Sequence, residues 1–130
     1  IAVADGARCL TTPAEIDRVC HAAYQWEAAS AGVPATDTVK TVDTSRFVES
    51  TTERGRTWLV QTPQVFLTEM IKAALTRAQQ KGTKLTDDCS AVEAMGYKVT
   101  VVAGSPDNIK LTTARDLDIA EGILAERSGK

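Results

Sequence analysis

Five short polar segments combine carboxylate, hydroxyl, amide and basic side chains, the groups that bind hydroxyls, cations and phosphates. They lie at residues 5–8, 37–40, 61–64, 86–88 and 106–110. Threonine hydroxyls can donate to phosphate oxygens, and arginine or lysine can neutralise phosphate charge. Each segment taken singly is also an ordinary turn or helix cap. Together they point to the chemistry of a phosphorylated ligand.

The first segment follows an apolar run over residues 1–4, which predicts a buried strand that ends in a loop. Open α/β sheets hold their ligands in loops of this kind. Asp5 would face a polyol hydroxyl or a metal, and Arg8 would face a phosphate. The alternative is a simple turn with a surface ion pair, and for these four residues alone that alternative is the commoner.

The last segment is the most distinctive, because a polar turn after a predicted strand ends in Lys110 and is followed by two threonines. Its alternative is a loop with an exposed lysine. Thr38 comes where a strand leaves the core, and alone it is a weak signal. Thr62 and Thr86 both read as helix caps, with Pro63 as a first helical residue. A helix N-terminus is also an anion site, so capping and binding are compatible.

Strand-like and helix-like patterns alternate along the chain, which predicts an α/β layer fold with a mostly parallel sheet. A capping box at Thr12 and Glu15 predicts the start of the first helix. The expected strands lie at residues 1–4, 31–36, 58–60 and 99–102. The expected helices run from Pro13 to about Ala29, through residues 70–78 to Gly82, from a cap at Thr86 through Ala94, and from Thr113 onward.

Residues 38–58 differ from the rest, because β-forming side chains alternate there with polar turns. The stretch has too few apolar residues for a core of its own. One interpretation is a β-arm that projects from the domain and is ordered by a partner surface. The other is a floppy surface hairpin, and composition alone does not separate them.

Composition narrows the class of protein. A chain of 130 residues, 43% hydrophobic and 25% charged, matches one globular domain. A net charge of -2 without a basic run excludes a nucleic-acid footprint. The three cysteines are widely spaced and His21 is the only histidine, which argues against disulfides and zinc and favours a reducing cytosol. No G-x-G-x-x-G pattern occurs, and a start on apolar Ile1 predicts a fragment of a longer chain.

In their order and spacing, the five segments resemble the C-terminal half of the 2-C-methyl-D-erythritol 4-phosphate cytidylyltransferases. The resemblance covers all of residues 1–130 but only about half of the family's chain. It implies a Rossmann-like nucleotidyltransferase layer fold, with residues 1–130 as part of one domain and residues 38–58 as a dimerisation arm. Two departures stand out: Ala4 occupies a position usually held by histidine, and Glu53 one where many members carry aspartate.

The resemblance also implies an activity, namely transfer of a cytidylyl group from CTP to methylerythritol phosphate in the non-mevalonate isoprenoid pathway. It implies Mg²⁺ or another divalent cation as cofactor, a homodimer formed through the arm, and a cytoplasmic location of bacterial type, with a plastid as the alternative. The other half of the family's chain would carry the glycine-rich CTP-binding loop. This piece alone is therefore expected to be inactive.

Site roles follow from the same resemblance. Lys110 and Asp5 would be catalytic, with Asp5 also near the metal, and Ala7 would contact the cofactor. The residues expected to hold the substrate are Arg8, Thr38, Thr62, Thr86 and, from a second subunit, Arg54. Two alternatives stay open: a ribitol 5-phosphate cytidylyltransferase on the same fold, and a non-catalytic dimerisation or substrate-side fragment.

Overall fold

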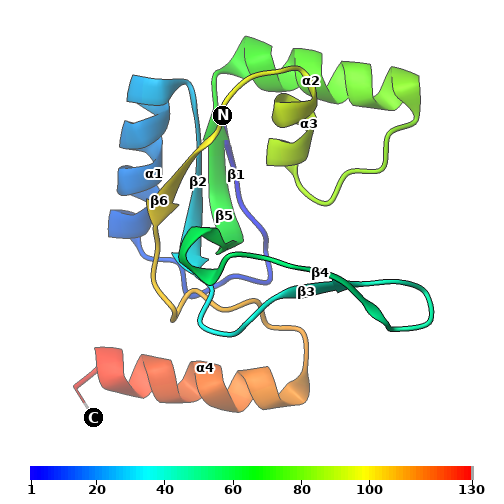
Figure 1. Ribbon diagram of the computed structural model, residues 1–130. Coiled ribbons are helices and arrows are strands. Elements are labelled where there is room, and N and C mark those ends of the chain that lie inside the picture. The colour runs from blue at the N-terminus through cyan, green and yellow to red at the C-terminus, as the bar shows by residue number, and fades with distance from the viewer. Residues whose placement is uncertain (130) are drawn as a thin grey trace.

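A four-stranded sheet in the order β1-β5-β2-β6 forms the centre of the computed structural model, which describes residues 1–129 (Figure 1). Strand β5 pairs antiparallel with both β1 and β2, and only β2 and β6 are parallel. The expectation of a mostly parallel sheet is therefore wrong for this chain. The strands are β1 (Ala2–Val3), β2 (Ala28–Pro34), β5 (Trp58–Phe66) and β6 (Thr100–Ala103).

The mixed pairing has a simple cause in the connection between β2 and β5. No α-helix lies between these two strands, whereas parallel neighbours need a crossover connection that is usually helical. Instead the chain runs out through a second, two-stranded sheet, made of β3 (Lys40–Val42) and β4 (Val48–Thr51), and returns beside β2. The return is therefore antiparallel.

Helices cover both faces of the sheet, with α1 on one side and α2 and α3 on the other (Figure 1). Ala28 and Phe66 pack with α2 and α3, whereas their neighbours Ala29 and Val65 pack with α1. Successive strand residues face opposite sides, so a strand buried on both faces must be apolar throughout. The helices are α1 (Pro13–Trp26), α2 (Thr68–Lys81), α3 (Asp88–Ala94) and α4 (Ala114–Arg127).

The first helix begins where the sequence predicts. Thr12 and Glu15 form the expected capping box, and Pro13 is the first helical residue. The helix ends at Trp26 rather than near Ala29, because Glu27 takes a left-handed conformation and Ala28 is already a buried strand residue. Burial in the sheet thus overrides the helical pattern at this end.

Thr62 does not cap a helix, so that part of the prediction is wrong. It lies inside β5, and α2 begins only at Thr68. Val65 and Phe66, just beyond Thr62, are buried in a strand that is paired on both sides, which outweighs the local Thr-Pro signal. The strand predicted at residues 58–60 therefore continues to Phe66 as β5.

The third helix starts one residue later than expected. Its cap is Asp87 rather than Thr86, because the Asp87 carboxylate accepts a hydrogen bond from the Ser90 backbone N–H at 2.9 Å. The Thr86 hydroxyl lies 3.1 Å from the Ser90 hydroxyl instead. Thr86 is thereby free of a capping role, and the helix ends at Ala94 as predicted.

The β3–β4 sheet extends away from the body of the chain within the stretch 38–58 (Figure 1). A 3₁₀ turn, η1 (Arg54–Arg56), follows it and leads into β5. Phe47 at its turn is 73% exposed, and Val42 and Val48 are also exposed. The stretch has no core of its own, as its composition indicates, and its role in dimerisation stays a prediction.

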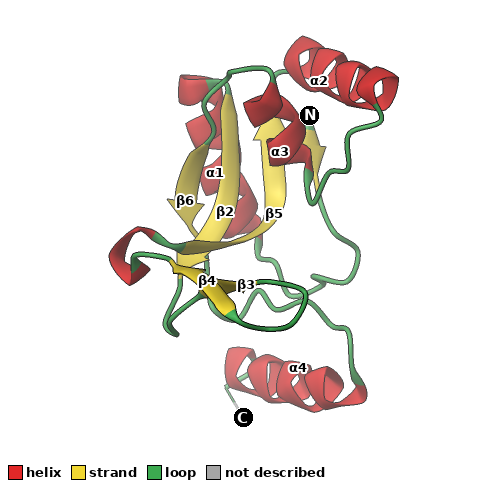
Figure 2. Cartoon of the chain, turned by 45° about the vertical axis from the view of Figure 1, so that its right-hand side comes forward, coloured by secondary structure: helices red, strands yellow, loops and turns green. Residues whose placement is uncertain are grey.

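Helix α4 lies beyond the end of the sheet (Figure 2) and is attached through a small third cluster. Ala120 and Ile123 pack there against Leu10, and the Arg127 guanidinium donates to the Leu10 carbonyl at 2.8 Å. Thr113 caps this helix, as the sequence predicts. Across residues 1–129, no helix is long and apolar enough to cross a membrane.

Candidate functional site

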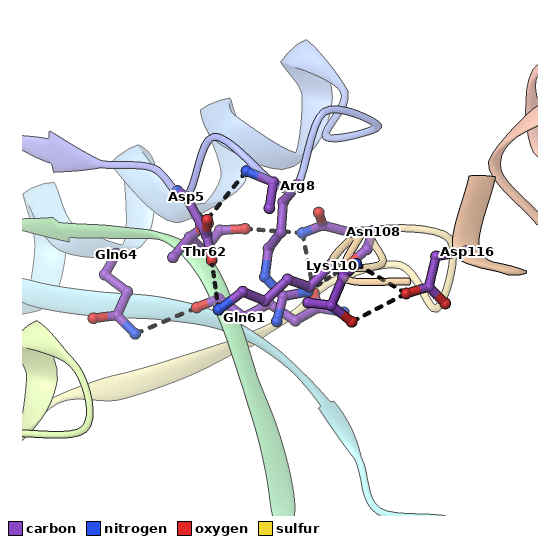
Figure 3. A network of polar contacts seen from close by, with 10 residues as sticks. Asp5, Arg8, Gln61, Thr62, Gln64, Asn108, Lys110 and Asp116 are labelled. Carbon is purple, nitrogen blue, oxygen red and sulfur yellow. Dashed lines mark hydrogen bonds and ion pairs between the residues drawn. The ribbon is translucent and has the colours of Figure 1, made fainter. Parts of the chain in front are cut away.

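A pocket of about 440 Å³ brings together five of the predicted site residues from distant parts of the chain. They are Asp5 and Arg8 after β1, Thr62 in β5, Thr86 before α3, and Lys110 after β6. Figure 3 shows four of them converging from separate elements. The pocket lies beside strand ends, where the sequence placed the candidate ligand groups.

The other three predicted residues do not line this pocket. Ala7 contributes through its backbone, since its N–H donates to Asp5 Oδ1 at 3.1 Å and its carbonyl accepts from the Leu111 N–H at 2.9 Å. Thr38 is exposed at the base of the β3–β4 sheet, and Arg54 is exposed on η1. The prediction for Arg54 concerns a second subunit and stays a prediction.

Asp5 and Lys110 form an ion pair in the wall of the pocket, with Lys110 Nζ 3.2 Å from Asp5 Oδ2. The hydrogen bond from the Ala7 N–H, followed by that from Lys110, holds the pKa of Asp5 below its ordinary value. The Lys110 side chain is 51% exposed, so its ammonium can also reach an incoming anion. The pair therefore places a carboxylate and a cation at one edge of the pocket.

Thr62 is oriented by the loop that carries Asp5. Its hydroxyl oxygen accepts a hydrogen bond from the Asp5 N–H at 3.0 Å. A hydroxyl has one proton to donate, and this contact leaves that proton available. Thr62 can therefore donate to an oxygen of a bound ligand.

Arg8 is held on one side only. Its Nη1 donates to the Asn108 carbonyl at 2.6 Å, which fixes the plane of the guanidinium. Arginine has five N–H donors in a rigid fork, so others remain for an anion in the pocket. The arrangement suits the phosphate contact that the sequence predicts for Arg8.

Three buried amide side chains support the pocket, and the sequence reasoning missed them. They are Gln61, Gln64 and Asn108. Gln64 joins the pocket to α3, because its Nε2 donates to Asp87 at 3.0 Å and its Oε1 accepts from the Cys89 N–H at 3.2 Å. The three lie inside the recognised segments, but nothing in their spacing shows that they are buried.

One known protein family matches almost the whole chain. The family described as 2-C-methyl-D-erythritol 4-phosphate cytidylyltransferase (IspD) matches residues 1–126. The chain belongs to this family. The family resemblance predicted from the five segments is thereby confirmed.

Individual IspD relatives agree with this assignment. Proteins named 2-C-methyl-D-erythritol 4-phosphate cytidylyltransferase from Pelotomaculum thermopropionicum and Caldanaerobacter subterraneus subsp. tengcongensis are 45% identical over 130 residues and 46% identical over 124. These alignments cover 100% and 95% of this chain and 55% of each relative. The chain thus spans about half the length of the curated relatives that it matches.

Solved IspD structures share the fold. The Thermus thermophilus enzyme superposes with a TM-score of 0.82 at 34% identity, over 94% of this chain and 60% of that one. The 4-diphosphocytidyl-2C-methyl-D-erythritolsynthase of Anaerococcus prevotii gives 0.87 at 30% identity, over 95% and 55%. The predicted α/β nucleotidyltransferase fold is therefore confirmed.

The family resemblance predicts a divalent cation, and the carboxylates that line the pocket are Asp5, Asp87 and Asp88. Residues 1–129 contain no group of three or more His, Cys, Asp or Glu side chains arranged to hold a metal. Mg²⁺ commonly takes one or two carboxylates and completes its shell with water and substrate phosphates. Asp5, which lines the pocket, fits the role of one such carboxylate.

Acid should destabilise this IspD chain through three carboxylates whose pKa values are lowered. Burial raises the pKa of Asp87, but hydrogen bonds from Ser90 and Gln64 outweigh it. Hydrogen bonds from the backbone N–H groups of Thr112 and Thr113 lower the pKa of Asp116. The pKa of Asp5 is lowered by its hydrogen bonds from Ala7 and Lys110.

A carboxylate whose pKa is lower in the folded state stabilises the fold at pH values above its unfolded-state pKa of about 3.9. This stabilisation is lost as the pH falls through the folded-state pKa. We therefore expect the urea midpoint to hold from pH 7 to about pH 5 and to fall toward pH 3. Asp116→Asn should make this fall shallower. A midpoint that rises on acidification would contradict the prediction.

Proposed function

We propose that the complete protein transfers a cytidylyl group from CTP to 2-C-methyl-D-erythritol 4-phosphate and releases pyrophosphate. The observation that carries this proposal is the single pocket shared by Asp5, Arg8, Thr62, Thr86 and Lys110. Membership of the IspD family and the printed names of the relatives support it.

The reaction explains why such side chains are needed. An oxygen of the substrate phosphate attacks the α-phosphorus of CTP and forms a new P–O bond. The bond from the α-phosphorus to the oxygen that bridges to the β-phosphate breaks, and pyrophosphate leaves with that oxygen. The attacking phosphate is already an anion at neutral pH, so no general base is required. Catalysis then depends on positioning two polyanions and neutralising their charge.

Each pocket residue takes one part of this task. Lys110 stabilises the charge that develops at the α-phosphate. Arg8, Thr62 and Thr86 hold the phosphate and hydroxyls of methylerythritol phosphate. Asp5 lies near the substrate hydroxyls and supplies one carboxylate to Mg²⁺, which when bound would neutralise phosphate charge. Ala7, which does not line the pocket, lies next to the cofactor site and holds Asp5 through its backbone N–H.

We also propose that this chain is the C-terminal, polyol-phosphate half of the family's single domain. Its 130 residues hold candidate substrate contacts but no G-x-G-x-x-G pattern. The glycine-rich nucleotide loop would then belong to the rest of the protein, and residues 1–130 alone would not turn over CTP. The same family membership and the three free cysteines support a cytoplasmic location of bacterial type, with a plastid as the alternative.

The test is a pyrophosphate-release assay on the complete protein with CTP, Mg²⁺ and methylerythritol phosphate. Release that needs both substrates supports the proposal. A parallel arm with ribitol 5-phosphate separates the sister activity, since turnover of that substrate alone would replace the proposed acceptor. Absence of release with either acceptor would leave a non-catalytic dimerisation fragment as the better interpretation.

The exposed β3–β4 sheet supports a homodimer in which the arm packs against a second copy. Phe47, Val42 and Val48 offer apolar contact surface there. Arg54 follows on η1 and would reach the partner's pocket. Phe47→Asp places a charge in that contact surface, so sedimentation velocity of the variant should show a monomer. A dimer in this variant would contradict the role of the arm.

Replacing Arg54 should weaken substrate binding more than catalysis. We expect Arg54→Ala to raise the KM for methylerythritol phosphate about tenfold or more with little change in kcat, because one charged hydrogen bond is lost. Arg56→Ala is the matched control, since Arg56 lies on the same turn and pairs with Glu53 at 3.8 Å on the surface. Equal kinetics for both variants and the wild type would show that Arg54 does not reach a partner's site.

A further inference from the structure

Asn108 is the most deeply buried polar side chain near the pocket, with an exposed fraction of 0%. Its Nδ2 donates to the Thr62 carbonyl at 2.8 Å and to Gln61 Oε1 at 3.3 Å. Its Oδ1 lies 2.9 Å from the Thr11 hydroxyl, which donates to it. The Thr62 carbonyl can only accept, so the amide nitrogen must face it.

The backbone of the same residue holds Arg8. The Asn108 carbonyl accepts from Arg8 Nη1 at 2.6 Å, and the Asn108 N–H donates to the Ser105 carbonyl at 3.1 Å. One buried residue therefore joins the loop after β6 to the loop after β1 and to β5. Figure 3 shows Asn108 beside Thr62 and Arg8, with its hydrogen bond to Thr62 dashed.

Hydrogen bonds fix the backbone both before and after Lys110. Two residues before it stands Asn108, and one residue after it the Leu111 N–H donates to the Ala7 carbonyl at 2.9 Å. The next residue, Thr112, donates its N–H to Asp116 Oδ2 in α4 at 2.9 Å. The Lys110 side chain itself is half exposed and pairs with Asp5 at 3.2 Å.

We infer that Asn108 is a positioning residue, which sets the place of Lys110 and Arg8 relative to Thr62 without touching the substrate. The inference rests on the proposed function for its kinetic consequence. A displacement of about 1 Å at a reacting group can cost on the order of 100-fold in rate. A buried amide that joins two loops and a strand is the group whose loss would cause such a displacement.

Asn108→Asp is the sharpest variant, because it keeps the size of the side chain and removes the donors to Thr62 and Gln61. In the complete protein we expect kcat to fall about 10- to 100-fold, with smaller changes in both KM values. Val19→Ala is the control: Val19 lies on the buried face of α1, is 1% exposed and does not line the pocket, so this change lowers stability alone. If Asn108→Asp lowers stability while kcat stays at the wild-type value, the inference is overturned.

A second readout does not need the proposed activity. Hydrogen exchange of the Leu111 amide should become faster in Asn108→Asp and stay unchanged in Val19→Ala. Faster exchange together with an inactive wild type would support the positioning role and remove the proposed function. Unchanged exchange at Leu111 would overturn the inference whatever the wild-type activity.

Thr11→Val is a milder variant that tests the same contact if Asn108→Asp does not fold. It removes only the hydroxyl that donates to Asn108 and shares its proton with the Arg8 carbonyl, also at 2.9 Å. We expect a smaller fall in kcat, with faster exchange at Leu111. Wild-type values for both in Thr11→Val, with Asn108→Asp unfolded, would count against the inference.

Discussion

Lys110→Ala in the complete protein should lower kcat by on the order of 100-fold or more, as expected for loss of one preorganised charge at a transition state. Lys110 lies 3.2 Å from Asp5 at the edge of the pocket, and the backbone on both sides of it is hydrogen-bonded. Its ammonium is thus held near the point where negative charge would develop. The interaction strengthens as that charge builds up, so kcat and kcat/KM should fall together.

The control for this prediction is Lys72→Ala, because Lys72 is an exposed lysine on α2 outside the pocket. Lys110→Arg keeps the charge but changes its geometry, and it should retain part of the rate if charge matters more than position. Pyrophosphate release at saturating CTP and methylerythritol phosphate gives kcat directly. Unchanged turnover in Lys110→Ala would remove this residue from the reaction.

Local signals in the sequence predicted much of the fold correctly. The capping boxes that begin α1 and α4 are complete in sequence, since Thr12 pairs with Glu15 and Thr113 with Asp116. Each is satisfied within four residues, so no tertiary contact is needed to interpret it. The five polar segments likewise led to five of the residues that line the pocket.

The errors occur where distant contacts override a local signal. Thr62 and Pro63 carry a convincing helix start, yet β5 continues through them because its next residues pair with β1 and β2. The register between β2 and β5 shifts between Ser30 and Gly32, opposite this point. Such irregularities re-aim side chains near active sites and depend on the partner strand. A single sequence does not record that partner.

The supporting amides were missed for a related reason. Gln61, Gln64 and Asn108 read as surface polar residues in turn-rich segments, where amides are common. Their burial is possible because each finds partners on other elements, such as the Thr62 carbonyl and Asp87. Burial of a polar group without such partners would be costly. The sequence therefore shows which groups can bind a ligand better than it shows what holds them.

Arg8→Ala should lower kcat/KM for methylerythritol phosphate by about 100-fold, chiefly through KM. A hydrogen bond to a charged group contributes about 1.5–3 kcal/mol, and the substitution also leaves the Asn108 carbonyl without its donor. Arg8→Lys should recover only part of the loss, because an ammonium cannot reproduce the planar fork that contacts both Asn108 and an anion. Arg18→Ala, an exposed change on α1, is the control.

The two variants separate binding from catalysis within one pocket. Lys110→Ala should leave the KM for methylerythritol phosphate near the wild-type value, whereas Arg8→Ala should raise it while CTP affinity stays constant. Urea unfolding of each variant shows whether a loss of stability accounts for the change. If both substitutions lower the same kinetic parameter to the same extent, Arg8 and Lys110 act on one group rather than on the phosphate and the α-phosphorus. Since Asn108 accepts a hydrogen bond from Arg8 and precedes Lys110 by two residues, that outcome would indicate a single anion-binding cluster centred on the loop after β6.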